Sequence, residues 1–196
     1  VWTFGGTEFT PATARMVQRY HLGSFIAFSR NIKSASQIAA FNSRAQAFAV
    51  KTQKLPMLLM VDQEGGPVTR VKLKTPLPSA LALGKFGDPT AITNYAKTMS
   101  ELLVSLGFNM NLAPVLDLSD PDQDTFIANR AFGNDPQQVS ELALAYAQGL
   151  SDSGMIPTAK HFPGHGGIVG DSHRGVAKKL ETEDRLHAHD WLPFSA

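Results

Sequence analysis

Short apolar runs that favour β-strands alternate along the chain with longer segments whose apolar residues recur at helical spacing. The runs lie at residues 24–28, 57–61 and 108–116, with weaker ones at 1–4 and 156–159. Continuous apolar strands separated by helices indicate a parallel sheet that helices cover. This alternation is the strongest constraint on the fold, and it predicts an α/β protein.

Capping residues and prolines mark where the helices begin. Thr10-Pro11, Asp88-Pro89 and Asp135-Pro136 each combine an N-cap residue with proline at the first helical position. Ser34 opens another helix, in which apolar residues recur at intervals of three and four, and Thr182 caps a further one. We therefore expect five helices, which begin near residues 10, 34, 88, 135 and 182.

Two architectures can complete a sheet of this kind. Five βα units fit into the 196 residues. A closed (β/α)₈ barrel typically needs ~250 residues, so the chain is roughly three units short of one. A complete doubly wound sheet of five strands fits the length well. Length alone therefore favours the doubly wound sheet, and only the functional motifs described below favour the barrel.

Composition excludes several classes of partner. Lys and Arg number 18 against 17 Asp and Glu, and no basic run is present, so nothing favours a nucleic-acid partner. The absence of cysteine excludes disulfides, thiolate zinc sites and thiol nucleophiles. The longest apolar stretch, residues 55–61, is too short to cross a bilayer. We expect a globular chain that uses neither nucleic acid nor a membrane.

Charged residues follow three of the predicted strands. In parallel sheets, functional groups collect where strands end and loops begin. Charged side chains next to buried strands also need partners or a ligand, although each one taken singly is equally well explained as a solvated loop residue. We expect the charged side chains that follow these strands to face one shared pocket: Asp62, Glu64, Arg70, Asp117, Arg130, Lys160, His161, Asp171 and His173.

The loop at residues 160–173 contains four glycines and one proline, so its backbone can turn sharply and approach a ligand closely. It lacks the Gly-Lys-Ser/Thr ending of a phosphate-binding loop, which leaves nucleotide binding unsupported. A metal site built from His161, His165, Asp171 and His173 is a minor alternative. Two histidines four residues apart would suggest a metal pair on a helix. Phe-Pro-Gly lies between His161 and His165, however, and cannot form the interior of a helix.

The end of this loop holds a candidate acid/base pair. Asp171 lies two residues before His173, and a neighbouring carboxylate favours the imidazolium form and orients the ring. Such a pair can deliver a proton and then recover it, as general acid/base catalysis requires. Taken alone, the spacing is common and more typical of a surface salt bridge.

Four motifs resemble those of a known enzyme family. VDQEGGPVTR at 61–70, NLAPVLD at 111–117 and NRAFG at 129–133 resemble glycoside hydrolase family 3. KHFPGHG at 160–166, followed after four residues by DSH at 171–173, is similar to the bacterial β-N-acetylglucosaminidase (β-hexosaminidase) branch of that family. The four motifs occur in the same order as in the family, and the resemblance covers essentially the whole chain. Pro67 departs from the pattern, because an arginine or another side chain is frequent there.

The resemblance implies a TIM-like (β/α)₈ barrel that removes single N-acetylglucosamine units from non-reducing ends, typically of peptidoglycan-derived fragments. It implies that His173 is the acid/base and that Asp171 is its partner. The residues that correspond to the sugar-binding positions of the family are Asp62, Arg70, Arg130, Lys160 and His161. The family chemistry needs no cofactor and no metal. The branch suggests the bacterial cytoplasm, with an exported form as an alternative, and oligomeric state is left open.

The resemblance also implies a nucleophile that the chain does not contain. In the family, an aspartate near the end of strand seven forms the covalent glycosyl intermediate of a retaining enzyme. The chain stops at Ala196, so we expect residues 1–196 to be the N-terminal portion of one barrel domain, without strands six to eight. We expect this portion to be inactive by itself and its longer parent to be the hydrolase.

Two other functions remain open. A non-catalytic saccharide-binding fragment would use the same pocket without the nucleophile. A glycoside phosphorylase would release the sugar with phosphate in the full-length parent, and a histidine acid/base suits it because a carboxylate would repel the incoming phosphate.

Overall fold

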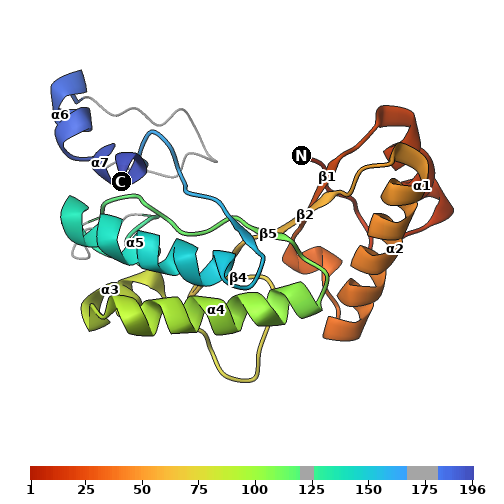
Figure 1. The fold of residues 1–196 in the computed structure, drawn as a ribbon, viewed down its shortest axis with the longest axis horizontal. Coiled ribbons are helices and arrows are strands. Elements are labelled where there is room, and N and C mark those ends of the chain that lie inside the picture. The colour runs from red at the N-terminus through yellow and green to blue at the C-terminus, as the bar shows by residue number, and fades with distance from the viewer. Residues whose placement is uncertain (120–125, 167–180) are drawn as a thin grey trace.

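The structure of the chain, a computed structural model, describes residues 1–119, 126–166 and 181–196. Four strands form a parallel sheet in the order β1-β2-β5-β6 (Figure 1). Their bounds are β1, Ser24–Ala27; β2, Leu58–Val61; β5, Met110–Asn111; and β6, Ile156–Pro157. Spatial order follows chain order with no reversal, whereas a doubly wound sheet reverses its order at a switch point. The sheet is therefore built as in a TIM-like barrel, and the architecture that length alone favours is wrong.

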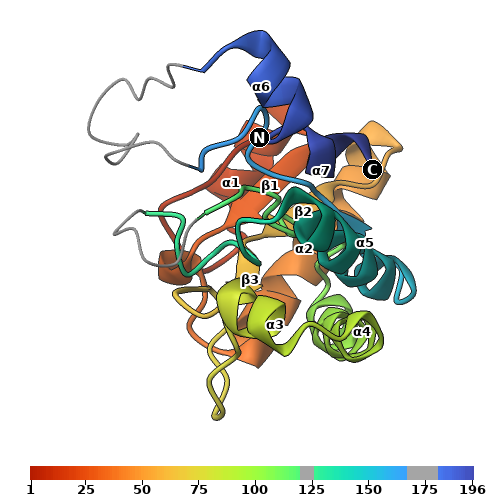
Figure 2. The same ribbon diagram turned by 90° about the vertical axis from the view of Figure 1, so that its left-hand side faces the viewer.

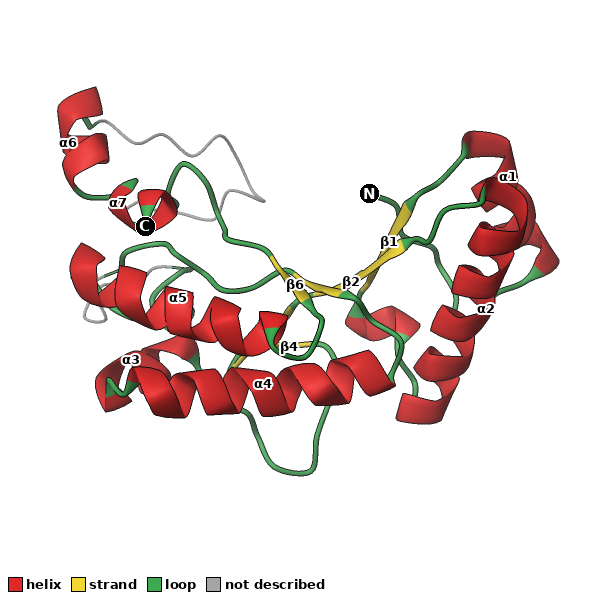
Figure 3. Ribbon diagram, viewed as in Figure 1, coloured by secondary structure: helices red, strands yellow, loops and turns green. Residues whose placement is uncertain are grey.

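Helices cover the outside of this sheet (Figures 1 and 3). Their bounds are α1, Pro11–Tyr20; α2, Ala35–Gln53; α3, Ala80–Phe86; α4, Pro89–Ser105; α5, Pro136–Ser151; α6, Glu183–Ala188; and α7, Leu192–Ser195. A short 3₁₀ turn spans Ser29–Asn31. In Figure 1, α1 and α2 lie at the right beside β1, while α3, α4 and α5 lie toward the left and bottom of the view.

The five predicted helix starts are confirmed. At each one, the N-cap side chain accepts a hydrogen bond from a backbone N–H in the first turn, which satisfies a donor that the helix itself leaves free. These caps are Thr10, Ser34, Asp88, Asp135 and Thr182. The helices α3 and α7 were not predicted from the sequence, although Ser79 caps α3 in the same manner.

The predicted strand at residues 1–4 is wrong. This segment contacts β1 through one hydrogen bond, from the backbone N–H of Ile26 to the carbonyl of Trp2, and is not a strand. The Phe4 ring packs instead against Phe25 and Phe41, with ring centroids 4.7 Å and 4.4 Å away. Aromatic burial therefore explains why this segment is apolar.

Two other segments differ from expectation. The run at 108–116 forms only the short strand β5 and an isolated parallel bridge from Val115 to Lys160. The segment after β2 forms an antiparallel hairpin of β3, Gln63–Gly65, and β4, Val68–Thr69, which the sequence did not predict. Both features lie at the carboxyl ends of the barrel strands, where the charged residues gather.

The core lies between the sheet and the helices and is filled by buried residues such as Phe25, Leu59, Ile92 and Leu142. The helices α4 and α5 lie side by side (Figures 1 and 2). Their close approach depends on Gly149, because a Cβ there would lie 2.2 Å from the carbonyl oxygen of Thr93. Within the described ranges, no helix combines the length and the apolar character needed to span a bilayer.

Candidate active site

A polar pocket of about 380 Å³ lies where β2 and β6 give way to the loops that follow them. Its lining combines charged and aromatic side chains: Phe28, Asp62, Glu64, Val68, Arg70, Phe126, Arg130, Lys160, His161 and His165. All five predicted sugar-binding residues are in this set. The predicted acid/base pair, Asp171 and His173, lies outside the described residues.

Lys160 connects two carboxylates at the floor of the pocket. Its ammonium nitrogen lies 2.7 Å from Asp62 Oδ1 and 2.6 Å from Glu64 Oε1. The side chains of Lys160 and Asp62 are each 14% exposed, whereas that of Glu64 is 4% exposed. Asp62 is therefore the more accessible of the two carboxylates, and Glu64 is the more buried.

Arg130 forms a two-pronged hydrogen bond with Glu64. Its Nε donates to Oε2 and its Nη2 donates to Oε1, both over 2.8 Å. Burial by itself would raise the pKa of Glu64, but the hydrogen bond from Arg130 and the charge of Lys160 outweigh burial and lower that pKa from its ordinary 4.5. Burial likewise opposes the charge on Arg130, yet the Glu64 carboxylate raises the Arg130 pKa overall. Both groups are therefore charged at neutral pH.

His161 is held from both sides of its ring. Nδ1 lies 2.5 Å from Oδ2 of Asp117, which is fully buried, and Nε2 lies 3.2 Å from Nη2 of Arg130. Because the carboxylate only accepts and the guanidinium only donates, Nδ1 of the ring is the donor in this network and Nε2 is the acceptor. The other oxygen of Asp117 accepts the backbone N–H groups of His161 and His165, over 3.3 Å and 2.6 Å. Asp117 thus fixes both the ring and the start of the loop.

Gln63 and Asn111 hold the two loops of the pocket together. Gln63 donates its backbone N–H to Asn111 Oδ1, and Asn111 Nδ2 donates back to the Gln63 carbonyl, each over 3.0 Å. The Gln63 side-chain oxygen accepts the backbone N–H groups of Arg70 and Val71. Both side chains are fully buried, so this network fixes the backbone on either side of the β3–β4 hairpin. Asp62 and Arg70 are thereby held near each other, with Nη2 of Arg70 3.9 Å from Oδ2 of Asp62.

The hairpin itself turns at two glycines. Gly65 and Gly66 have φ values of +95° and +52°, a region that side chains disfavour. A Cβ on Gly65 would also lie 2.2 Å from the carbonyl oxygen of Pro78. The Gly-Gly pair therefore permits the turn that returns the chain from Glu64 to Arg70.

Formal charges in the cluster balance. Asp62, Glu64 and Asp117 supply three negative formal charges, and Arg70, Arg130 and Lys160 supply three positive ones. The formal charges of these six groups sum to zero. Such a site suits a neutral polyhydroxylated ligand, whose hydroxyl groups both donate and accept hydrogen bonds.

Aromatic rings form the walls above this polar floor. Phe126 is 45% exposed at the rim, and the guanidinium of Arg130 lies 4.7 Å from the centre of its ring. On another wall, Phe28 lies 6.0 Å from the guanidinium of Arg70. These flat apolar faces are suited to the C–H face of a ligand that also carries hydroxyls.

From the sequence, Glu64 and Asp117 are expected only as charged residues at strand ends, with no specific role. A signal for Glu64 was present, because residues two apart on an extended chain point to the same side. Asp62 and Glu64 share a side, whereas the Gln63 side chain bonds the backbone of Arg70 and Val71 instead. His165, considered only as a metal ligand, also lines the pocket. Among the described residues, no three His, Asp or Glu side chains are arranged to hold a metal ion.

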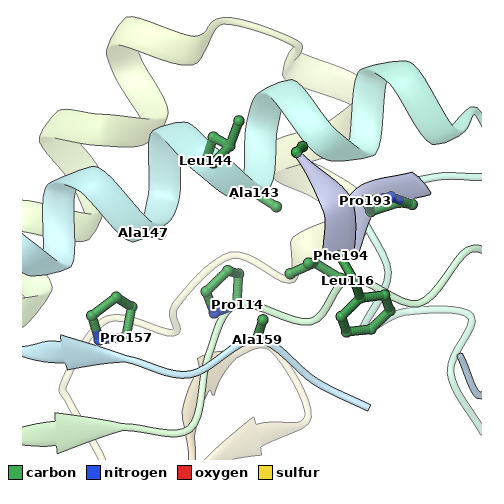
Figure 4. Close-up of a pocket in the computed structure, with 10 residues that line it drawn as sticks. Pro114, Leu116, Ala143, Leu144, Ala147, Pro157, Ala159, Pro193 and Phe194 are labelled. Atoms are coloured by element: carbon green, nitrogen blue, oxygen red, sulfur yellow. The ribbon is translucent and has the colours of Figure 1, made fainter. Parts of the chain in front are cut away.

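A second cavity, of about 220 Å³, lies between α5, α7 and the ends of β5 and β6 (Figure 4). Its lining consists of proline, leucine, alanine and phenylalanine side chains: Pro114, Leu116, Ala143, Leu144, Ala147, Pro157, Ala159, Pro193, Phe194 and Ala196. Because none of these side chains is titratable, none of them can transfer a proton.

Fold and site together define a barrel-type α/β protein with a polar ligand pocket at the carboxyl ends of its strands. Comparison with known proteins identifies the family. Residues 3–196 match the family described as "Glycosyl hydrolase family 3 N terminal domain". The chain belongs to glycosyl hydrolase family 3.

Named relatives agree with this assignment. The chain is 35% identical over 181 residues to "Beta-hexosaminidase LpqI" of Mycobacterium tuberculosis, which covers 91% of this chain and 45% of that protein. It is 40% identical over 179 residues to "Beta-hexosaminidase" of Methylococcus capsulatus, which covers 89% of this chain and 52% of that protein. The chain thus spans about half the length of these curated relatives.

Solved structures agree as well. A family 3 β-N-acetylglucosaminidase from Paenibacillus sp. str. FPU-7 superimposes with a TM-score of 0.89 at 33% identity, covering 98% of this chain and 37% of that one. NagZ from Neisseria gonorrhoeae, in complex with N-trifluoroacetyl-D-glucosamine, gives a TM-score of 0.89 at 30% identity, covering 98% of this chain and 57% of that one. The barrel-type fold expected from the sequence motifs is confirmed.

Proposed function

We propose that this chain forms the sugar-binding part of a retaining exo-β-N-acetylglucosaminidase that acts on peptidoglycan-derived fragments. The observation that carries the proposal is the convergence of Asp62, Arg70, Arg130, Lys160 and His161 on one pocket. The relatives named beta-hexosaminidase support it, as does the NagZ structure that holds an N-acylated glucosamine.

The pocket residues would recognise the terminal sugar through its hydroxyl groups. Asp62 would accept hydrogen bonds from hydroxyls, and Lys160 and Arg70 would donate to them, which fixes the ring for reaction. Because these groups are largely buried, a sugar that lacks a matching hydroxyl would leave a charged group unpaired. Rejection of such sugars would then be strong.

The reaction itself would use His173, oriented by Asp171. An aspartate nucleophile from a later strand would attack the anomeric carbon while His173 protonates the departing glycosidic oxygen. Water would then attack the same carbon, release the aspartate and give its proton to His173, which restores both groups. Residues 1–196 hold no aspartate in the sequence context of the family nucleophile, so we propose that this stretch alone binds the sugar without hydrolysing it.

The test compares the complete gene product with its His173→Ala variant on an N-acetylglucosaminide whose leaving group is poor. A poor leaving group needs the proton, so the variant should lose about 10²- to 10⁴-fold in kcat. An acidic leaving group would hide part of this loss. Unchanged turnover of the poor substrate by the variant would exclude His173 as the acid/base.

Other outcomes would favour the alternatives. Stimulation by phosphate, with release of a sugar 1-phosphate, would identify a phosphorylase. Calorimetric binding of N-acetylglucosamine without turnover by the complete gene product would identify a saccharide-binding protein.

We assign the activity to the bacterial cytoplasm, with an exported form as the alternative, and cell fractionation distinguishes the two.

A further inference from the structure

We propose that Glu64 is a positioning residue of the sugar site, which holds Lys160 and Arg130 in place without touching the sugar itself. The inference rests on the proposed function, because it concerns how the same pocket binds N-acetylglucosamine. It assigns a specific role to a residue that the resemblance to the family leaves without one.

The contacts of Glu64 leave it little capacity to bind a ligand. Oε1 contacts Lys160 Nζ at 2.6 Å and accepts from Arg130 Nη2 at 2.8 Å, while Oε2 accepts from Arg130 Nε at 2.8 Å. An ionised carboxylate has about four lone-pair sites, and three are occupied here. The side chain is also only 4% exposed, so it acts through the two cations rather than on a ligand.

Glu64 is in contact with both cations, and its Oε1 atom is shared between them. Two cations this close repel each other, and both are largely withdrawn from water. The shared anion is therefore what keeps them adjacent. Without it, Lys160 would retain its contact with Asp62, and Arg130 would retain its hydrogen bond to the His161 ring.

The backbone around Glu64 is also well placed for this role. Glu64 lies in β3, between the hydrogen-bonded Gln63 and the glycine turn at Gly65. Arg130 and Lys160 reach it from segments 66 and 96 residues further along the chain. One carboxylate on β3 thus holds together side chains from two distant segments.

The experiment replaces Glu64 with glutamine in the complete gene product, which keeps the shape and removes the charge. We expect the Kd for N-acetylglucosamine, measured by calorimetry, to rise by about tenfold or more, and KM to rise more than kcat falls, because uniform sugar binding is weakened. Glu101→Gln, at an exposed position on α4, is the matched control and should change neither.

A double-mutant cycle separates positioning from a general effect on folding. If Glu64 acts through Lys160, then Glu64→Gln should raise the Kd for N-acetylglucosamine by a much smaller factor in a Lys160→Met background than in the wild-type protein. If sugar affinity falls by the same factor in both backgrounds and the Tm is also lower, the role is merely structural and the proposal is overturned. Glu64→Asp keeps the charge but shortens the reach, so it should recover only part of the affinity.

Further readouts keep this proposal separate from the proposed function. If the wild-type protein binds the sugar and Glu64→Gln binds it equally well, the positioning role fails while the proposed function stands. A crystal structure of Glu64→Gln should show Lys160 and Arg130 moved apart whatever the ligand, and unchanged positions would overturn the role. Should Glu64→Gln fail to fold by circular dichroism, Glu64→Asp provides the test, and wild-type affinity in that variant would overturn the role.

Discussion

Oδ2 of Asp117 lies 2.5 Å from Nδ1 of His161, although 44 residues separate the two in the sequence. The contact joins the end of the β5 segment to the start of the loop after β6, and Oδ1 of the same carboxylate accepts two backbone N–H groups of that loop. A fully buried side chain with this many partners is a fixed point of the site. The orientation of the His161 ring is therefore decided by a residue beneath the pocket.

Replacing Asp117 with asparagine should loosen this fixed point. Asparagine keeps one acceptor oxygen for the backbone N–H groups but loses the charged acceptor of His161 Nδ1. A hydrogen bond to a charged acceptor contributes about 2 kcal/mol, so we expect unfolding by urea to show a loss of about that size. Affinity for N-acetylglucosamine should also fall, because His161 loses its fixed tautomer. Asp152→Asn, at an exposed position after α5, is the control, and equal stability of the two variants would contradict the prediction.

Stability should depend on pH through Glu64. Its pKa is lowered from 4.5 in the folded protein, so folding favours the ionised form. The stabilisation is complete above that ordinary value and is lost as pH falls through the folded-state pKa. The stability difference between wild type and Glu64→Gln, measured by urea unfolding, should therefore be constant near neutral pH and shrink below pH 4.5. A difference that grows on acidification would contradict this sign.

Gly149→Ala should destabilise the packing of α4 against α5. The new Cβ would lie 2.2 Å from the Thr93 carbonyl oxygen and 2.8 Å from the Ala96 Cβ, so the helices must move apart. Overpacking of this kind costs roughly 1–3 kcal/mol, which thermal or urea denaturation measures. At Gly23 a Cβ would meet nothing within 4 Å, so Gly23→Ala should leave stability nearly unchanged. Equal stability of the two variants would argue against a tight α4–α5 contact.

Removing the ring at the rim should weaken sugar binding modestly. In Phe126→Ala the Arg130 guanidinium loses the ring that lies 4.7 Å away. A cation–π contact at an exposed site contributes about 0.5–1 kcal/mol, which corresponds to a roughly two- to fivefold rise in Kd if the ring helps to hold Arg130 in place. The exposed ring of Phe86, at the end of α3, supplies the control variant Phe86→Ala. Calorimetry that finds no difference between the two variants would exclude a contribution from the rim.

The sequence by itself determined the helix starts, the α/β class and the family motifs. Each predicted N-cap, such as Ser34 or Asp135, is confirmed because capping depends on a side chain and a backbone N–H only two or three residues away. The grouping of Asp62, Arg70, Arg130, Lys160 and His161 in one pocket was likewise predictable, since parallel strands end at one edge of a sheet. Asp171 and His173 stay predictions.

Only the tertiary structure decided the order of the strands and the partners within the pocket. The chain length favours a doubly wound sheet, but length does not specify the order of the strands. The apolar run at 1–4 resembles a strand, but a local pattern does not specify which segments pair. Glu64 and Asp117 became central for the same reason. Their partners lie 44 to 96 residues away, and contacts over such separations are set by how the whole chain packs, not by the residues beside them.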